Sequence, residues 1–411
     1  MRKIALLLAL GLTATSCRGG SDANGLELWT MQLKPTFTTY METVLTEYRK
    51  QHPDLPVTWV DVPAAGLENK LLTAIAGGHP PDLVNLNPAF AAKLSEQNVL
   101  TPLDDKVKAI HGLYFPKVWE GCQLDGKTFA IPWYLSTAVT MANRDILAAA
   151  GLPPVPPATY DDVARMGAAV KASTGKALFM PNFGDSGTFM ETLVKMGVPL
   201  LVNGAPAFAS AAGETALQFW VDLYKAGIIP KESLTEKHRE AIDRFQAGQI
   251  AMLSSGPQFL TLIKENAPQL FGKIVVGPQL SSPNGPIGVS LMNLVVPKAS
   301  KHQDAAIALG AFLTNGENQL ALAKLAPVLP SVTKAAADPF FTAGGSDVVG
   351  EARRISAGQL PRATVLVKPM THQPELAKAL DTALQQACLG ERTARAALEE
   401  AATVWRNRLS H

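Results

Sequence analysis

The sequence predicts an α/β protein with mostly parallel sheets and helices flanking those sheets. Short apolar runs typical of buried strands alternate with longer segments in which apolar residues recur at helical spacing. The first elements follow the order β-α-β-α-β, which favours parallel strands connected by helices on the faces of a sheet. With 411 residues, 47% of them hydrophobic, the chain can build roughly two to three domains with cores of their own.

The N-terminal half supplies the clearest alternation. We expect strands at 26–30, 57–60, 82–86, 127–132 and 139–143, and helices at 35–51, 67–76, 88–96 and 104–111. Pro53 ends the first helix, because proline lacks the amide hydrogen that a helix needs, and Gly77 with Gly78 ends the second. These signals place the turns as well as the elements.

The C-terminal half begins a second domain. The Pro-rich segment 153–157 introduces a helix at 160–172, after which the chain continues with further helices and short strands. We expect helices at 216–227 and 242–248, strands at 250–254, 274–277 and 294–296, and two closing helices within 374–409 that are broken at Gly390. Trp220 lies on the apolar side of its helix, so we interpret it as a core residue.

The first residues predict export from the cytoplasm. A basic start at Arg2 and Lys3 precedes an apolar run at 4–12, which is too short to span a membrane, and small residues precede Cys17. This segment resembles a bacterial lipoprotein signal, so we expect a signal peptide at 1–16, lipid on Cys17 and a flexible tether at 17–25. Ala14 stands where such signals usually carry Leu, and ordinary cleavage with simple secretion stays open. Both routes place the mature chain outside the cytoplasm, in the periplasm or on the outer face of the cell membrane.

Composition and charge exclude several classes of protein. The net charge of +2 is scattered, so no basic face argues for nucleic acid. Cys122 and Cys388 are too few for a disulfide framework, and we interpret them as buried thiols in different lobes, with one bridge left open. The seven histidines show no metal-ligand spacing, and we expect neither a metal nor a cofactor.

Five segments together resemble the extracellular solute-binding proteins of the maltose-binding-protein type. They occur in the order of that family across nearly the whole mature chain, although residues 140–142 (TMA) replace the tyrosines usual there. The five segments are 26–29 (LELW), 82–85 (DLVN), 125–133 (DGKTFAIPW), 143–147 (NRDIL) and 245–252 (FQAGQIAM).

This resemblance implies the two-lobed periplasmic binding protein fold (type II), with the ligand in a cleft between the lobes. It implies a first lobe of 26–135 plus 289–330 and a second of 136–288 plus 331–411, with crossings near 134–138, 286–290 and 329–332. Such proteins close around the ligand by hinge motion and are then recognised by the permease of an ABC importer. We expect a monomer that performs no covalent chemistry.

Candidate ligand-binding residues follow the carboxyl ends of the strands, where open α/β sheets bind ligands. Trp133 and Tyr134 offer flat apolar faces to a sugar ring, although packing beneath the hinge is an alternative. Asn85 and Asn87 offer amide groups to hydroxyls, and Asn87 before Pro88 is also a candidate N-cap. The remaining candidates are Gln32, Lys34, Phe37, Asn182, Phe183, Asp185, Gly256, Gln258, Ser290, Asn293 and His372.

The resemblance implies a solute receptor of an ABC importer, and these residues favour a neutral mono- to oligosaccharide as its ligand. A phosphorylated polyol such as glycerol phosphate is the alternative, and it would need positively charged contacts. Among the candidates only Lys34 has a permanent positive charge, so the neutral sugar is favoured. Presentation of the ligand to a sensor kinase also stays open.

A hydrolase is the competing class. A glycoside hydrolase would need two facing carboxylates, and no motif nominates such a pair. Ser186 lies in a segment similar to a protease nucleophile loop, but Thr188 replaces the expected glycine and no histidine motif precedes it.

Overall fold

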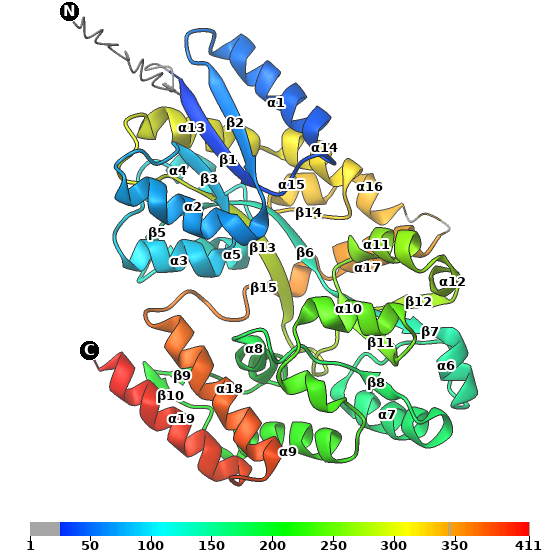
Figure 1. The fold of residues 1–411 in the computed structure, drawn as a ribbon. Helices are drawn as coiled ribbons and strands as arrows, with labels where there is room; N and C mark the ends of the chain where they lie inside the picture. Colours follow the sequence, from blue (N-terminus) through cyan, green and yellow to red (C-terminus); the bar gives the residue numbers. More distant parts are fainter. Residues whose placement is uncertain (1–24, 344, 346, 411) are drawn as a thin grey trace, which may run out of the picture.

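The computed structural model describes residues 25–343, 345 and 347–410, and it divides them between two α/β lobes that lie one above the other (Figure 1). The predicted signal peptide, Cys17 and all of the predicted tether except Gly25 lie outside the described residues. The chain enters the upper lobe first, and its C-terminal helices belong to the lower lobe.

The sheet of the first lobe has seven strands, in the order β14-β6-β13-β3-β1-β2 with β15 paired to β13. Its strands are β1 (Leu26–Met31), β2 (Val57–Val62), β3 (Leu83–Leu86), β6 (Ile131–Thr137), β13 (Ile287–Val295), β14 (Leu329–Pro330) and β15 (Ala363–Thr364). β1 pairs in parallel with β2 and β3, whereas β13 runs antiparallel to both β3 and β6. The sheet is therefore mixed, and the expectation of mostly parallel sheets is wrong in this respect.

The second lobe has a four-stranded sheet in the order β12-β7-β11-β8, and it is also mixed. β11 is parallel to β8 but antiparallel to β7, and β12 is antiparallel to β7. These strands are β7 (Val139–Asn143), β8 (Ala177–Phe179), β11 (Ile250–Ser255) and β12 (Ile274–Gly277). Two short hairpins lie outside the sheets: β4 (Gln123–Leu124) with β5 (Lys127–Thr128), and β9 (Leu201–Val202) with β10 (Ala205–Pro206).

Helices cover the sheets and begin where the sequence supplies caps. Asn87 accepts a hydrogen bond from the Phe90 amide with Pro88 at the first helical position, and Thr159 accepts one from the Asp162 amide. The helices of the first lobe are α1 (Thr38–Gln51), α2 (Ala64–Ala76), α3 (Pro88–Glu96), α4 (Lys108–His111), α5 (Pro116–Trp119), α13 (Gln303–Leu313), α14 (Gly316–Leu325), α15 (Thr333–Ala336) and α16 (Pro339–Thr342).

The helices of the second lobe include the two that close the chain, and α17 (Val348–Gly358) lies between the lobes. Those of the second lobe are α6 (Arg144–Ala149), α7 (Tyr160–Thr174), α8 (Thr188–Lys195), α9 (Ala211–Lys225), α10 (His238–Gln246), α11 (Phe259–Asn266), α12 (Pro268–Phe271), α18 (Gln373–Leu389) and α19 (Ala394–Leu409). Gly390 is left-handed at the end of α18, as its place between the two closing helices predicts.

Apolar cores lie on both faces of each sheet. In the first lobe one core contains Trp133 and Tyr48, and the other contains Trp29 and Phe90. In the second lobe the larger core is built around Trp220. Cys122 and Cys388 are buried, free thiols in cores of different lobes, as expected. Across the described residues, no helix combines the length and the apolar character that crossing a membrane requires.

The third crossing between the lobes lies later in the chain than 329–332. Val332, Ala335 and Phe341 pack into the cores of the first lobe, so the assignment of 331–342 to the second lobe is wrong. Ala352 of α17 packs into a core of the second lobe, but Leu360 and β15 lie in the first lobe again. The chain passes finally into the second lobe after β15, where Val367 packs into its larger core. Strands of two residues carry no periodic pattern that could have revealed this.

Two buried glutamines connect the first two crossings to the segment that follows α17. The Gln359 side chain donates to Thr137 Oγ1 at 2.8 Å and to the Ala138 carbonyl at 3.0 Å, and it accepts from the Gln279 amide at 2.7 Å. The Gln279 side chain forms two bonds to the backbone of Gly288, at 2.7 and 3.0 Å. The Gln359 side chain uses both of its donor hydrogens and its oxygen, so the network orders the segments beside the crossings.

Candidate functional site

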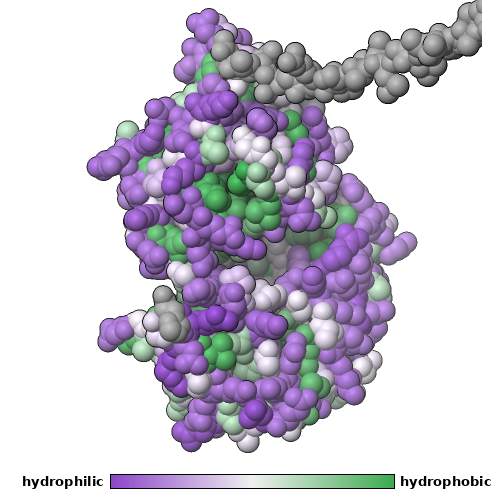
Figure 2. Space-filling model, turned by 60° about the vertical axis from the view of Figure 1, so that its left-hand side comes forward, coloured by the Kyte–Doolittle hydropathy of each residue, from purple (hydrophilic) through white to green (hydrophobic). Residues whose placement is uncertain are grey.

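The surface is hollowed between the two lobes (Figure 2), and the carboxyl ends of β1 and β2 point toward this hollow (Figure 1). Loops that follow parallel strands are the usual ligand-binding elements of open α/β sheets. Below we call Gln32, Lys34, Trp59, Asp61 and Tyr134 the first wall, and Asn182, Asp185, Glu191, Lys195 and His238 the second wall.

The Asp61 carboxylate organises the first wall. Its Oδ1 accepts hydrogen bonds from the Thr30 hydroxyl at 2.7 Å and the Leu33 amide at 2.8 Å, and its Oδ2 accepts from the Lys34 amide at 2.9 Å. β1 and β2 pair in parallel with Thr30 opposite Asp61, so the strand register sets this contact. The carboxylate therefore fixes the loop after β1 in one conformation.

Aromatic rings lie beside this carboxylate. Trp59 is half-buried, its Nε1 donates to Thr30 Oγ1 at 2.7 Å, and the Lys34 ammonium lies 4.4 Å from its ring centroid. Tyr134 is also half-buried, and burial together with the nearby Asp61 charge raises the pKa of its hydroxyl. The first wall thus combines partly exposed rings with a carboxylate, which suits a ligand having apolar faces and hydroxyl edges.

The floor of the hollow comes from one face of the paired strands β6 and β13. Tyr134 is opposite Met292 and Ser136 is opposite Ser290, and side chains directly opposite each other in an antiparallel pair share a face. Ser290 is exposed. Because this ribbon also carries two of the crossings, the floor connects the lobes.

A second aspartate organises the second wall. Asp185 Oδ2 accepts from the Asn182 side chain and from the His238 amide, each at 2.9 Å. The His238 ring is 2.9 Å from Ser255 Oγ through Nε2 and packs edge-on against Phe259. Burial lowers the pKa of His238, although the Asp185 charge opposes this shift, so the ring is neutral near pH 7.

Helix α8 brings two charges to the second wall. A side chain added at Gly288 would lie 3.4 Å from Lys195 Cε, and Gly288 shares a face of β13 with Ser290, two residues further on. Glu191, one turn earlier on α8, keeps access to solvent. Desolvation by surrounding protein raises its pKa and lowers that of Lys195, and each charge opposes the shift of the other.

Four predicted site residues are buried in the structure and cannot contact a ligand in this conformation. Trp133 is 0% exposed and packs into a core of the first lobe, which is the alternative that the sequence left open. Phe183 packs edge-on against Trp220 at 5.1 Å in the core of the second lobe. Asn85 donates to the Asn293 carbonyl at 3.2 Å, and both asparagines are 0% exposed.

The other candidates lie at the surface with local partners. Gln32 is exposed in a left-handed conformation, and Phe37 is half-buried just before α1. Asn87 caps α3. The Gln258 side chain folds over Gly256, where an added Cβ would meet its Oε1 at 2.2 Å, so a side chain at that position would displace the Gln258 amide. His372 lies away from the first wall, and its amide donates to Glu96 at the end of α3.

Sequence reasoning missed Trp59, Asp61, Glu191, Lys195 and His238. One signal was available, because Trp59 and Asp61 are two residues apart in a strand and so share a face at its carboxyl end. Glu191 and Lys195 gave no signal, since a charged pair on a helix is ordinary surface chemistry. Ser186 donates its hydroxyl to Asp381 at 2.9 Å. No group of three or more metal-binding side chains occurs within the described part of the chain.

Comparison with known proteins identifies one family model. The model for bacterial extracellular solute-binding proteins matches residues 32–320, which is most of the chain. The structure is similar to a periplasmic-binding protein from Synechococcus sp. MITs9220, solved in complex with zinc, whose assignment to oligosaccharides is itself provisional. That likeness has a TM-score of 0.86 and 37% identity, and covers 94% of this chain and 99% of that one.

Two curated proteins illustrate the range of relatives. An arabinooligosaccharide-binding protein of Bacillus subtilis (strain 168) is 26% identical over 330 residues, which cover 76% of this chain and 74% of that protein. An uncharacterized lipoprotein of Streptomyces antibioticus is 23% identical over 354 residues, which cover 82% of this chain and 78% of that protein.

Proposed function

This chain belongs to the family of bacterial extracellular solute-binding proteins, and we propose that it is the substrate-binding component of an ABC sugar importer. Its ligand is a neutral mono- to oligosaccharide, held between the first and second walls and enclosed by hinge closure. The family is non-catalytic, so the ligand is bound and released without conversion.

The observation that carries this proposal is the first wall. The Asp61 carboxylate, which fixes the loop after β1, adjoins the half-buried rings of Trp59 and Tyr134. Sugar rings have an apolar C–H face that packs on aromatic rings, and a hydroxyl edge that donates to carboxylates. The arabinooligosaccharide-binding relative supports the same class of ligand.

The charges of the two walls favour a neutral ligand over glycerol phosphate or another phosphorylated polyol. Asp61, Asp185 and Glu191 contribute three carboxylates, whereas Lys34 and Lys195 contribute two ammonium groups. Lys34 is already placed over the Trp59 ring, and Lys195 is opposed by Glu191. A phosphate group would need an uncommitted cation or a helix N-terminus, and these walls direct neither toward it.

Delivery to a membrane permease and attachment through lipid on Cys17 are parts of the same proposal. The permease partnership is inferred from the family alone, and the lipid anchor from the sequence that precedes Cys17. The relative from Streptomyces antibioticus is itself a lipoprotein, which agrees with this location. Closure requires that the ligand bind the closed form more tightly than the open one.

A thermal-shift screen of residues 26–411 tests the ligand class directly. The panel should contain mono-, di- and trisaccharides, polyols and glycerol phosphates. A ligand at a hundred times its dissociation constant stabilises the folded protein by ~2.7 kcal/mol, which is measurable. We expect hits among the neutral sugars, with the sugar recovered unchanged afterwards.

Two other outcomes would change the proposal. Hits confined to phosphorylated compounds would replace the neutral sugar and point to Lys34 and Lys195 as phosphate ligands. Release of a shorter product from any sugar would contradict a binding function without catalysis.

A further inference from the structure

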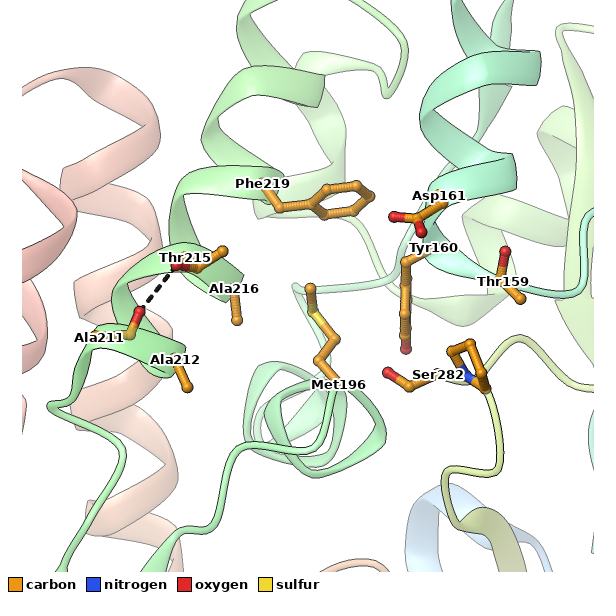
Figure 3. Close-up of a pocket in the computed structure, with 11 residues that line it drawn as sticks. Thr159, Tyr160, Asp161, Met196, Ala211, Ala212, Thr215, Ala216, Phe219 and Ser282 are labelled. Atoms are coloured by element: carbon orange, nitrogen blue, oxygen red, sulfur yellow. Dashed lines mark hydrogen bonds between the residues drawn. The ribbon is translucent and has the colours of Figure 1, made fainter.

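A second cavity lies within the second lobe, separate from the hollow between the lobes (Figure 3). Its volume is about 540 Å³, within the usual range for small-molecule sites. It is bounded by the start of α7, by Met196 after α8, by one side of α9 and by the loop that carries Ser282 and Pro283. None of its lining residues belongs to the first or second wall.

One end of this cavity is apolar. Phe219 and Ala216 of α9 face Met196 across it in Figure 3, and Ala212 lies beside them. Trp220 Nε1 lies 3.2 Å from Met196 Sδ, and the Phe219 and Tyr160 rings meet edge-on with centroids 6.0 Å apart. These contacts hold the apolar end in a defined shape in the absence of a ligand.

The other end carries two hydroxyl groups without partners. Tyr160 is 7% exposed, and neither its hydroxyl nor that of Ser282 has a side-chain hydrogen bond within the described residues. Both hydroxyls point toward the same end of the cavity in Figure 3. By contrast, the Thr215 hydroxyl is already bonded to the Ala211 carbonyl at 2.9 Å, and that of Thr159 to Asp162 at 2.8 Å. The Tyr160 oxygen is not one of the fully buried polar atoms without a partner, so both hydroxyls keep contact with the cavity and can pair with water or with a ligand.

We propose that this cavity is a second binding site, for a small uncharged aromatic compound that carries a hydroxyl group. The aromatic ring packs between Phe219, Met196 and Ala216, and its hydroxyl pairs with Tyr160 and Ser282. No lysine or arginine lines the cavity, so a carboxylate or phosphate finds no counter-charge there. The Asp161 carboxylate also lines the cavity, but it is exposed, and water screens its charge. A sugar is also a poor match, because most of its hydroxyls would face apolar side chains.

Ligand-observed NMR titration of the mature protein tests this site with three probes of similar size. Phenol has the ring and the hydroxyl, toluene has the ring alone, and benzoate adds a charge. We expect saturable binding in the order phenol, toluene, benzoate. Absence of saturable phenol binding, or tighter binding of benzoate, would overturn the proposal.

Two substitutions locate the binding and separate its parts. Ala212→Trp fills the apolar end from an exposed position, and it should weaken phenol and toluene at least ~10-fold. Tyr160→Phe removes one hydroxyl, and it should weaken phenol roughly threefold to tenfold while leaving toluene unchanged. Unaltered phenol binding by Ala212→Trp would contradict the site. Unaltered phenol binding by Tyr160→Phe would contradict its polar end.

Gln218→Trp is the matched control for the filling variant. Gln218 is exposed on the same helix, α9, and does not line the cavity. It should bind phenol like the unchanged protein. Melting curves of all three variants show whether a loss of binding reflects loss of the fold. If Ala212→Trp does not fold, Tyr160→Phe still tests the site.

Discussion

In the first wall the Asp61 carboxylate fixes a loop whose neighbours are aromatic rings, whereas in the second wall the Asp185 carboxylate fixes a loop followed by charged residues of α8. Both walls therefore use one aspartate to order a loop, through two backbone amides in the first wall and through one backbone amide and the Asn182 side chain in the second. They differ in what they offer to a ligand. A ring face contributes through burial of apolar surface and needs contact from one side only.

Charged groups behave differently, because their interactions strengthen as water leaves the site. Glu191 is exposed and Lys195 is half-buried, so both charges still have access to water in this structure. The first wall is therefore suited to bind the ligand while the lobes are apart. The second wall is suited to stabilise the closed form.

The largest expected effect is on stability, and it concerns Trp133 in the core behind the first wall. Trp133→Ala should lower the free energy of unfolding by ~3–5 kcal/mol, because the ring is fully buried in the core of the first lobe. Chemical denaturation measures this loss, with Trp59→Ala as the half-buried counterpart that should lose less stability. A Trp133→Ala protein that is as stable as the parent but binds sugar poorly would restore Trp133 to the ligand site.

Removal of Asp61 should have the largest effect on binding. Asp61→Ala releases two backbone amides and one hydroxyl, so we expect sugar affinity to fall ~100-fold, or ~2.7 kcal/mol, in a calorimetric titration. Asp61→Asn keeps the shape and one acceptor oxygen, and it should lose less. Equal affinity in Asp61→Ala would remove the first wall from the site.

The corresponding change in the second wall should be smaller. Asp185→Ala frees Asn182 and the His238 amide, and we expect affinity to fall ~10-fold, mainly through faster dissociation once closure is less favourable. Stopped-flow fluorescence separates the two rate constants. Asp222→Ala, an exposed aspartate on α9, is the control and should change neither rate. A loss confined to the association rate would reverse the roles assigned to the walls.

The smallest effect is a dependence on pH that belongs to the second wall. Because burial lowers the pKa of His238, the unfolded chain takes up a proton there at a higher pH than the folded protein does. The stability that the neutral ring contributes is present above about pH 6.5 and declines as the pH falls below that value. Melting temperatures of the parent should fall more steeply than those of His238→Gln between about pH 7.5 and about pH 5.5. Parallel curves would show that His238 does not titrate in this range.

The sequence predicted long elements well because each has a periodic pattern and clear ends. The predicted strand at 139–143 is β7, and the break at Gly390 separates α18 from α19. The direction of the strands was harder, since β13 joins the first sheet from about 150 residues beyond β6 and reverses the pairing there. The third crossing was missed because β14 and β15 are two residues long.

The candidate site was predicted less completely than the fold. Trp59 and Trp133 both lie in strands, and no sequence pattern decides which ring is enclosed by a core from elsewhere in the chain. A register shift between Met292 and Asn293 further changes which β6 side chains share the floor. The second wall depended on α8, whose charges become site residues only because β13 passes beside them.

The order of the strands along the chain has a consequence for biogenesis. The second sheet is built from a continuous stretch, β7 to β12, whereas the first sheet lacks its central partner until β13 has emerged. A chain that leaves the cytoplasm from its N-terminus would present β1, β2 and β3 long before the strand that completes their sheet. The first lobe would therefore finish folding only after most of the polypeptide has crossed the membrane. The N-terminal part would form little stable structure before then, so folding there would not hinder passage of the chain through the export channel.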